Sequence, residues 1–99
     1  MRSIVDGHTY ELENSDGTVQ PLQFIHKEIK DDGALEVVAE GTTNEEVLEV
    51  MIARLTCLHE NLPDLYTKNA LGDLQHALEQ LQARNSDRER RGVKGTNNA

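Results

Sequence analysis

The sequence predicts an α+β fold, in which a small antiparallel β-meander precedes an antiparallel two-helix hairpin. Two observations predict it: apolar and polar residues alternate in parts of the first forty positions, and apolar residues recur every three or four positions afterwards. Ninety-nine residues is the length of one small domain. We expect a single domain over 1–96, with the meander at about 7–40, the hairpin at about 43–92 and a frayed tail at 97–99.

Three short strands make up the predicted meander. Residues 8–13 alternate polar and apolar, the next strand spans about 18–28, and residues 35–39 form the third. Turn-forming Asn, Asp and Gly residues separate them. Pro21 has no N–H to donate, so its part of the strand is expected at an edge or a bulge. The face of the meander that packs on a helix would carry Tyr10, Leu12, Val19 and Phe24 or Ile25.

The first helix is expected to begin at the capping box 43–46, in which a threonine precedes a glutamate by three positions. Pro63 ends it or begins the connection. Apolar residues spaced 3, 4, 3 and 4 form its main stripe: Leu48, Met51, Leu55, Leu58 and Leu62. A second stripe contains Val47, Val50 and Cys57, and Arg54 interrupts it.

The second helix is expected to start between Asp64 and Lys68 and to reach about Arg91, with Gly92 as its C-terminal cap. Its apolar stripe is Leu71, Leu74, Leu78 and Leu81, with Ala70 and Ala77 beside it. Two apolar seams joined by a short linker predict an antiparallel hairpin.

Composition limits the possible functions. The chain has 18 acidic and 10 basic residues, a net charge of −8, which argues against general nucleic-acid binding. An acidic mimic of DNA stays open on charge alone. A single cysteine cannot form an internal disulfide, and neither a secretory signal nor a membrane span is recognised, so we expect an intracellular protein. Only three aromatic residues are present, and such a thin core predicts oligomerisation.

The cations are gathered near the C-terminus. Residues 84–95 hold five of the ten, opposed by two acids, a local balance of +3. Arg84, Arg88 and Arg91 are spaced i, i+4 and i+7, so they share one helix face with Asp87. The guanidinium fork binds phosphate in a bidentate manner, and the set predicts a site for a small, multiply charged anion. The alternatives are a solvated face that complements the helix dipole and an intersubunit salt-bridge network.

Other candidate sites are weaker. Arg54 is either a surface residue whose stem lies along the apolar helix or a guanidinium at a pocket wall. The four histidines lack the spacing of metal ligands, and no nucleophile, acid–base pair or glycine-rich phosphate loop is recognisable. We therefore expect no enzyme activity, no metal and no cofactor.

Three blocks of this sequence resemble the first-described family of Thoeris anti-defence proteins of bacteriophages, the signal sponges. The first block is Gly7-His8-Thr9-Tyr10-Glu11-Leu12-Glu13-Asn14, followed by Gln23-Phe24-Ile25. The second is Gly41-Thr42-Thr43-Asn44-Glu45-Glu46-Val47-Leu48, leading through Arg54-Leu55 to Asn61-Leu62-Pro63. The third spans 84–96, where the family shows an arginine, often a threonine, then Asp-Arg, another arginine and a Val-x-Gly ending.

The resemblance implies a β-meander with a helix hairpin that dimerises and can assemble into hexamers. It also implies capture, without cleavage, of the cyclic ADP-ribose signals of bacterial TIR-domain proteins, and in some members of the cyclic oligonucleotides of CBASS immunity. Applied to this chain, the resemblance suggests the ligand-binding residues Arg54, Arg84, Asp87, Arg88 and Arg91. Thr42, Asn61 and Asn85 are the second-ranked candidates.

The chain differs from the family at two positions. Asn85 stands where threonine is frequent, and Leu62 stands before Pro63 where the family usually has an aromatic residue. If that ring stacks on adenine in relatives, Leu62 removes about 1–3 kcal/mol of stacking. The leading hypothesis is a non-catalytic phage protein in the cytoplasm of an infected bacterium that sequesters a nucleotide-derived immune signal. Its main rival is a structural or adaptor protein that makes only protein contacts.

Overall fold

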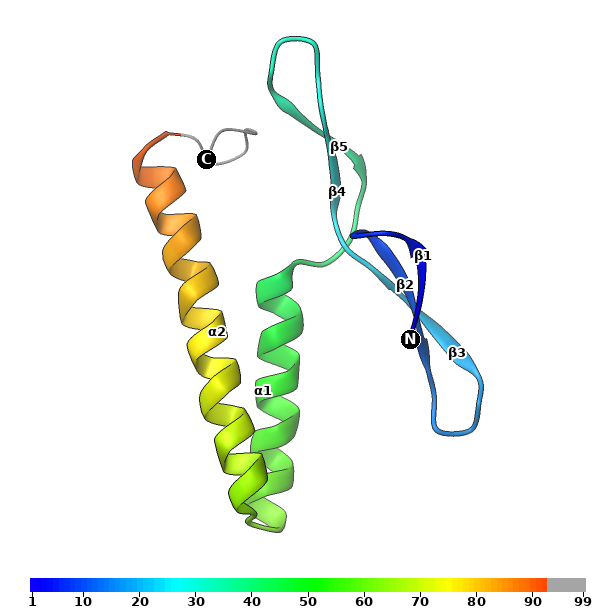
Figure 1. Ribbon diagram of the computed structural model, residues 1–99, viewed down its shortest axis with the longest axis vertical. Coiled ribbons are helices and arrows are strands. Elements are labelled where there is room, and N and C mark those ends of the chain that lie inside the picture. The colour runs from blue at the N-terminus through cyan, green and yellow to red at the C-terminus, as the bar shows by residue number, and fades with distance from the viewer. Residues whose placement is uncertain (93–99) are drawn as a thin grey trace. The chain divides into compact units, whose positions relative to one another are not determined.

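The computed structural model describes residues 1–92 (Figure 1). It confirms the α+β class: five antiparallel strands in two small sheets are followed by two helices. Within the described part the chain divides into two compact units, 1–43 with all the strands and 44–92 with both helices. The oligomer and the single packed domain stay predictions. The predicted frayed tail at 97–99 lies outside the described residues.

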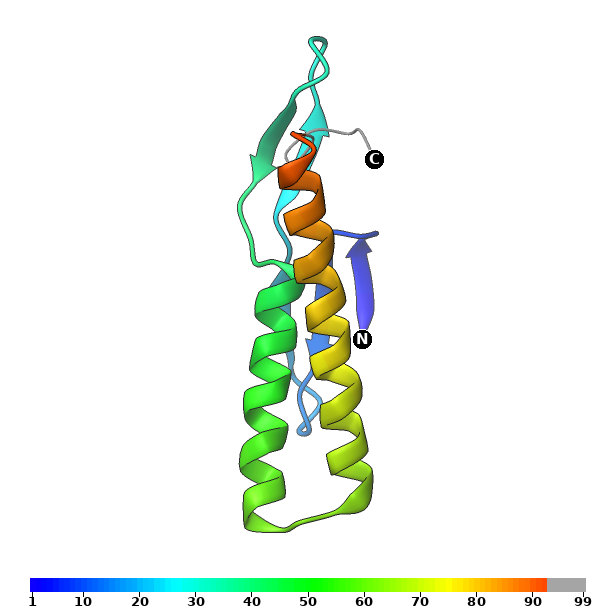
Figure 2. The same cartoon turned by 90° about the vertical axis from the view of Figure 1, so that its left-hand side faces the viewer.

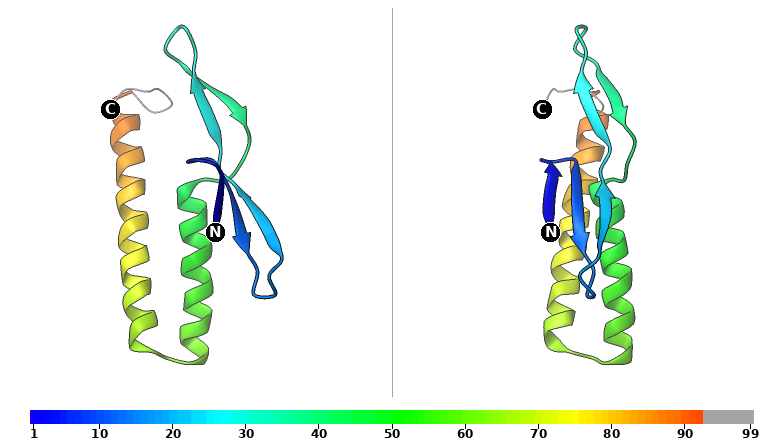
Figure 3. Two further views of the ribbon diagram at one scale, coloured as in Figure 1. Left: turned by 45° about the vertical axis from the view of Figure 1, so that its right-hand side comes forward. Right: turned by 90° about the vertical axis from the view of Figure 1, so that its right-hand side faces the viewer.

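The first sheet has the order β1-β2-β3 and contains β1 (Arg2–Val5), β2 (Thr9–Glu13) and β3 (Val19–Gln23) (Figure 3). Pro21 lies on β3, an edge strand, as predicted. The turn before β3 relies on Asp16, whose carboxylate accepts hydrogen bonds from the hydroxyl and the backbone N–H of Thr18. These two bonds, the hydroxyl's first, lower the pKa of Asp16.

The second sheet is a hairpin of β4 (His26–Ile29) and β5 (Leu35–Ala39). The predicted three-stranded meander is therefore wrong, because the strand expected at 18–28 is two strands that pair with different partners. The break falls at Phe24 and Ile25. The Phe24 N–H donates to the His8 carbonyl oxygen at 2.7 Å, whereas that of Ile25 donates to Thr42 at 2.9 Å.

Strand β1 was not predicted, and its short segment has no alternating pattern that would reveal it. Its apolar residues Ile4 and Val5 are 48% and 45% exposed. The strand exists through backbone pairing with β2, in which Arg2 lies opposite Glu11. Their side chains form an ion pair at 2.8 Å.

A close backbone crossing joins the two sheets. Phe24 and Thr42 form a parallel bridge, and the Thr42 N–H donates to the Gln23 carbonyl oxygen at 2.8 Å. A Cβ at Gly41 would lie 2.5 Å from that same Gln23 oxygen, so only glycine fits without a shift of the backbone. The ring of His8 stacks on that of His26, with centroids 3.6 Å apart.

The predicted apolar face of the strand unit is partly correct. Tyr10, Leu12, Phe24 and Ile25 are half-buried, and the rings of Tyr10 and Phe24 meet edge to face at 6.1 Å. Val19 does not belong to this group, since it is 56% exposed near the end of the β2–β3 hairpin.

The helices α1 (Asn44–Asn61) and α2 (Leu65–Arg90) run side by side in opposite directions (Figures 1 and 2). α1 begins directly after Thr43, the predicted cap. Asp64 caps α2: its carboxylate accepts from the N–H groups of Tyr66 and Thr67. The Tyr66 N–H and then the Thr67 hydroxyl lower the Asp64 pKa. Gly92 follows α2 with a φ of 73°, the left-handed conformation expected of a C-terminal glycine.

The seam between the helices differs from the predicted stripe on α1. Leu48 and Leu55 are half-buried as expected, whereas Met51, Leu58 and Leu62 are 40%, 45% and 78% exposed. Ile52 and His59 are among the half-buried α1 residues that neither predicted stripe contains. On α2 the predicted leucines and Ala70 are half-buried and Ala77 is exposed. The α1 seam is thus rotated relative to the stripe, and α2 does not cover one apolar side of α1.

Candidate anion-binding site at the end of the second helix

Four arginines occupy the last two turns of α2 and its C-terminal cap. Arg84, Arg88 and Arg90 belong to the helix, and Arg91 is the cap residue. The helix places them there because the α-helical backbone continues past Leu81, where the apolar seam ends. Cations at this position also complement the negative end of the helix dipole.

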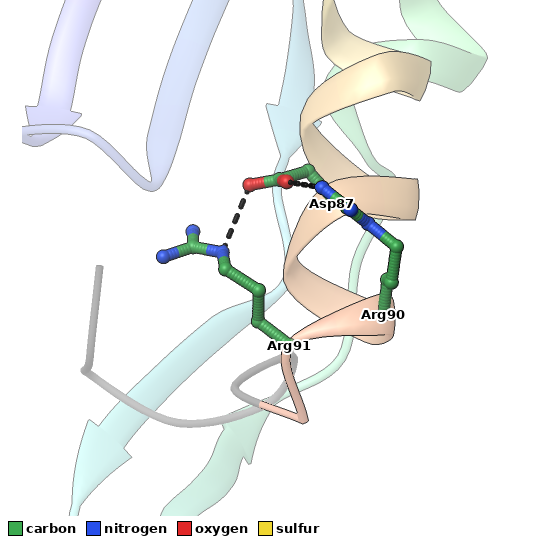
Figure 4. Close-up of polar contacts among 3 residues, drawn as sticks. All are labelled: Asp87, Arg90 and Arg91. Carbon is green, nitrogen blue, oxygen red and sulfur yellow. Dashed lines mark hydrogen bonds and ion pairs between the residues drawn. The ribbon is translucent and has the colours of Figure 1, made fainter.

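Asp87 organises two of these arginines. Its Oδ1 lies 2.6 Å from a terminal nitrogen of Arg90, and its Oδ2 lies 2.9 Å from Nε of Arg91 (Figure 4). One carboxylate therefore bridges the arginines three and four positions further on. Arg90 was missing from the predicted set because the i, i+4, i+7 face excluded it. The i, i+3 spacing from Asp87 would have revealed it.

The cluster retains positive charge after this pairing. Residues 84–92 contain four arginines against Asp87 and Glu89, a balance of +2. Arg84 is exposed and forms no ion pair with residues 1–92, while Arg88 is half-buried. The side chains of Arg90 and Arg91 are 78% and 47% exposed. Guanidinium groups with this exposure can reach a phosphate, and the Asp87 bridge reduces the conformational entropy that Arg90 and Arg91 lose on binding.

Asn85 connects this end of α2 to the first turn of α1. Its Nδ2 donates to Oε1 of Glu45 at 3.0 Å, and both residues are half-buried. Glu45 was not among the predicted site residues. The antiparallel hairpin register could have found it, because pairing the leucine seams brings the start of α1 beside the end of α2.

Arg54 and Asn61 are not brought to the cluster within one subunit. Arg54 lies nine residues beyond Glu45 in α1, about 13 Å along the helix axis, and Asn61 lies sixteen residues beyond it, about 24 Å. Arg54 is exposed and has no ion pair with the described residues. Thr42 belongs to the strand unit, where its N–H and carbonyl oxygen bond to Gln23 and Ile25. The structure thus supports a cluster of Arg84, Asn85, Asp87, Arg88 and Arg91, with Glu45 and Arg90 added.

Other parts of the described chain offer less. No group of three His, Cys, Asp or Glu side chains in 1–92 is placed to hold a metal ion. A groove of about 470 Å³ at the β4–β5 turn is lined by Lys30, Asp31, Asp32 and Glu36, so its charge disfavours an anion. Cys57 is an exposed free thiol.

No helix among the described residues has the length and apolar character needed to cross a membrane. Comparison of the chain with protein-family models, with curated proteins and with solved structures gives no match.

Proposed function

We propose that this chain is a non-catalytic binding protein that captures a nucleotide-derived immune signal and keeps it from its effector. The ligand class is the cyclic ADP-ribose isomers of Thoeris defence, extending to the cyclic oligonucleotides of CBASS. The proposed setting is the cytoplasm of a bacterium infected by a phage. The resemblance of the three sequence blocks to the Thoeris anti-defence family supports this choice of ligand, and no cofactor is needed.

The observation that carries the proposal is the arginine cluster at the end of α2. It presents four guanidinium groups within eight residues of a protein whose net charge is −8. Asp87 bridges Arg90 and Arg91 and holds their side chains close together. Oriented arginines suit a compact ligand with two or three phosphates, because each phosphate can take a bidentate pair.

A second copy of the chain is part of the proposal. Every described residue retains solvent exposure, so residues 1–92 contain no fully buried core. The side of α1 that α2 does not cover carries Val50, Met51 and Leu58, and Leu62 follows the helix; these side chains are 40–78% exposed. Burying these side chains against another subunit supplies the missing apolar contact. A homodimer, with further assembly to a hexamer, could also bring Arg54 or Asn61 of one subunit to the arginine cluster of another.

Calorimetric titration with cyclic ADP-ribose isomers and cyclic di- and trinucleotides tests the proposal. A sequestering protein needs nanomolar affinity, about −12 kcal/mol. Replacing Arg84 or Arg88 by Ala should weaken binding about 10- to 100-fold each, since a hydrogen bond to a charged group contributes about 1.5–3 kcal/mol. The matched control is Lys68→Ala, which removes an exposed cation from the first turn of the same helix. If Arg84→Ala, Arg88→Ala and Lys68→Ala weakened binding equally, the cluster would act only through the overall charge of the protein.

The fate of the ligand separates a binding protein from an enzyme. Heating the complex should release the captured molecule unchanged, as chromatography with mass detection would show. A cleaved product would assign the chain to an enzyme class instead.

The second candidate function is a structural or adaptor role, favoured by the apolar side of α1 that α2 does not cover. It predicts no affinity for any nucleotide in the panel. Under that reading, replacement of Arg84, Arg88 and Arg91 by Glu would leave assembly and partner binding unchanged.

A further inference from the structure

The contact between Asn85 and Glu45 determines which atoms of the Asn85 amide remain for a ligand. It is a hydrogen bond of 3.0 Å between half-buried side chains forty positions apart. It lies where the apolar seam ends, since Asn85 follows Leu81 by one helical turn and Glu45 precedes Leu48 on α1. The surrounding helix pair therefore holds both side chains in place.

The chemistry of the two groups allows one orientation of the amide. An ionised carboxylate only accepts hydrogen bonds, so the Asn85 nitrogen, rather than its oxygen, must face Glu45. The Oδ1 oxygen accepts no hydrogen bond from residues 1–92. Asn85 thus adds an acceptor between Arg84 and Arg88, whose guanidinium groups are donors only.

We infer that Glu45 is a positioning residue that fixes the Asn85 amide, so that the site selects a ligand with a hydrogen-bond donor beside its phosphates. This inference rests on the proposed function. In an adenine nucleotide the donor is either the 6-amino group of the base or a free ribose hydroxyl. A ligand that places only a hydrogen-bond acceptor beside Oδ1 cannot form a hydrogen bond with it, so the site binds that ligand more weakly.

Ligand analogues identify the donor. In one, hypoxanthine replaces adenine, so a carbonyl oxygen stands in place of the amino group; in the others, fluorine replaces one ribose hydroxyl at a time. The wild-type protein should bind one of these analogues about 10-fold more weakly than the parent cyclic ADP-ribose isomer, because a polar group that loses its partner costs roughly that factor. The donor is the group that has been replaced in the analogue that binds more weakly.

The Glu45→Gln variant tests the role of Glu45. A glutamine at this position can donate as well as accept, so the Asn85 amide can turn round and present its nitrogen to the ligand. The selectivity of the wild-type protein should then fall to less than about 3-fold. The control is Glu49→Gln, which makes the same charge change at an exposed position of α1 one turn further on. It should keep the 10-fold selectivity.

A measurement without ligand checks the contact itself. In nuclear magnetic resonance spectra of the free protein, the side-chain NH₂ signals of Asn85 should move in Glu45→Gln, because that variant changes the group that accepts from Nδ2. The same signals should keep their wild-type positions in Glu49→Gln. Asn85 signals that are unchanged in Glu45→Gln would overturn the inference whatever the binding data.

The failures are distinguishable. If the wild-type protein binds no nucleotide, the proposed function and this inference fall together. If it binds the parent isomer but discriminates against none of the analogues, or if Glu45→Gln keeps the wild-type selectivity, the inference alone is overturned.

Discussion

The strand unit and the helix unit of this protein are stabilised in different ways. In the strand unit, two small sheets depend on one crossing, where Gly41 and Thr42 meet the backbone of 23–25. In the helix unit, the contact is spread along the length of α1 and α2, and each residue of the seam is only half-buried. A single substitution can therefore disrupt the first unit, whereas the second should lose stability in small steps.

The largest expected effect is that of Gly41→Ala. The added Cβ would lie 2.5 Å from the Gln23 carbonyl oxygen and the Phe24 carbonyl carbon, and neither backbone atom can move without breaking the crossing. We expect a loss of about 3 kcal/mol in the free energy of unfolding, measured by urea denaturation.

Gly72→Ala is the matched control for that prediction. Gly72 lies inside α2 and a Cβ there would meet no atom within 4 Å. The same substitution should stabilise the protein by about 0.5–1 kcal/mol, because alanine has the higher helix propensity. Destabilisation by both substitutions would contradict the steric account of Gly41.

An intermediate effect is expected for Leu74→Ala. Leu74 is half-buried in the helix seam, so its truncation should cost about 1.5 kcal/mol, below the range for fully buried leucines. Leu62→Ala, at a side chain that is 78% exposed, should change the free energy of unfolding by less than about 0.5 kcal/mol in dilute protein. A larger, concentration-dependent effect at Leu62 would show that another subunit covers it.

The effect of Asp64→Ala depends on pH. The folded pKa of Asp64 is lowered from 3.8, chiefly by the Tyr66 N–H, so its carboxylate stabilises the folded state above about pH 4. That stabilisation is lost as the pH falls through the lowered pKa. The variant should melt at a lower temperature than the wild-type protein at pH 7, and the gap should narrow toward pH 2.

Asp73→Ala is the control for the cap. Asp73 lies on an exposed position within α2 and has no hydrogen bond or ion pair with residues 1–92. The difference in melting temperature between Asp73→Ala and the wild-type protein should not narrow as the pH falls. If both variants behave alike, the effect arises from overall charge and not from the cap.

Local patterns predicted the helix unit well. The capping position, the start of α2 after Asp64, the C-terminal glycine and the leucines of α2 all follow from side chains within a few positions of one another. The same patterns did not identify the face of α1 that meets α2, because Ile52 and His59 belong to neither of its two predicted apolar stripes. In the structure Met51 and Leu58 are exposed, whereas Ile52 and His59 are half-buried.

The strand unit was harder to predict because its contacts are non-local. The sequence marks turns and alternation, which located β2 and β5, but nothing in 18–28 shows that Phe24 pairs with His8 and Ile25 with Thr42. These hydrogen bonds join backbone groups, which are the same in every residue type except proline. Side-chain patterns therefore carry little information about them.

The candidate site also combines local features, which the sequence predicts, with non-local contacts, which it does not. The sequence alone determined that half of the cations gather near the C-terminus, on a helix that continues beyond its apolar seam, because both features are local. The pairing of Asp87 with Arg90 and Arg91 is local too, since it joins residues three and four positions apart. Only the tertiary structure decided that Asn85 is held by Glu45, and that Arg54 and Asn61 lie apart from the cluster in one subunit. Side-chain rotamers and the helix-pair register set these contacts, and both depend on packing between distant segments.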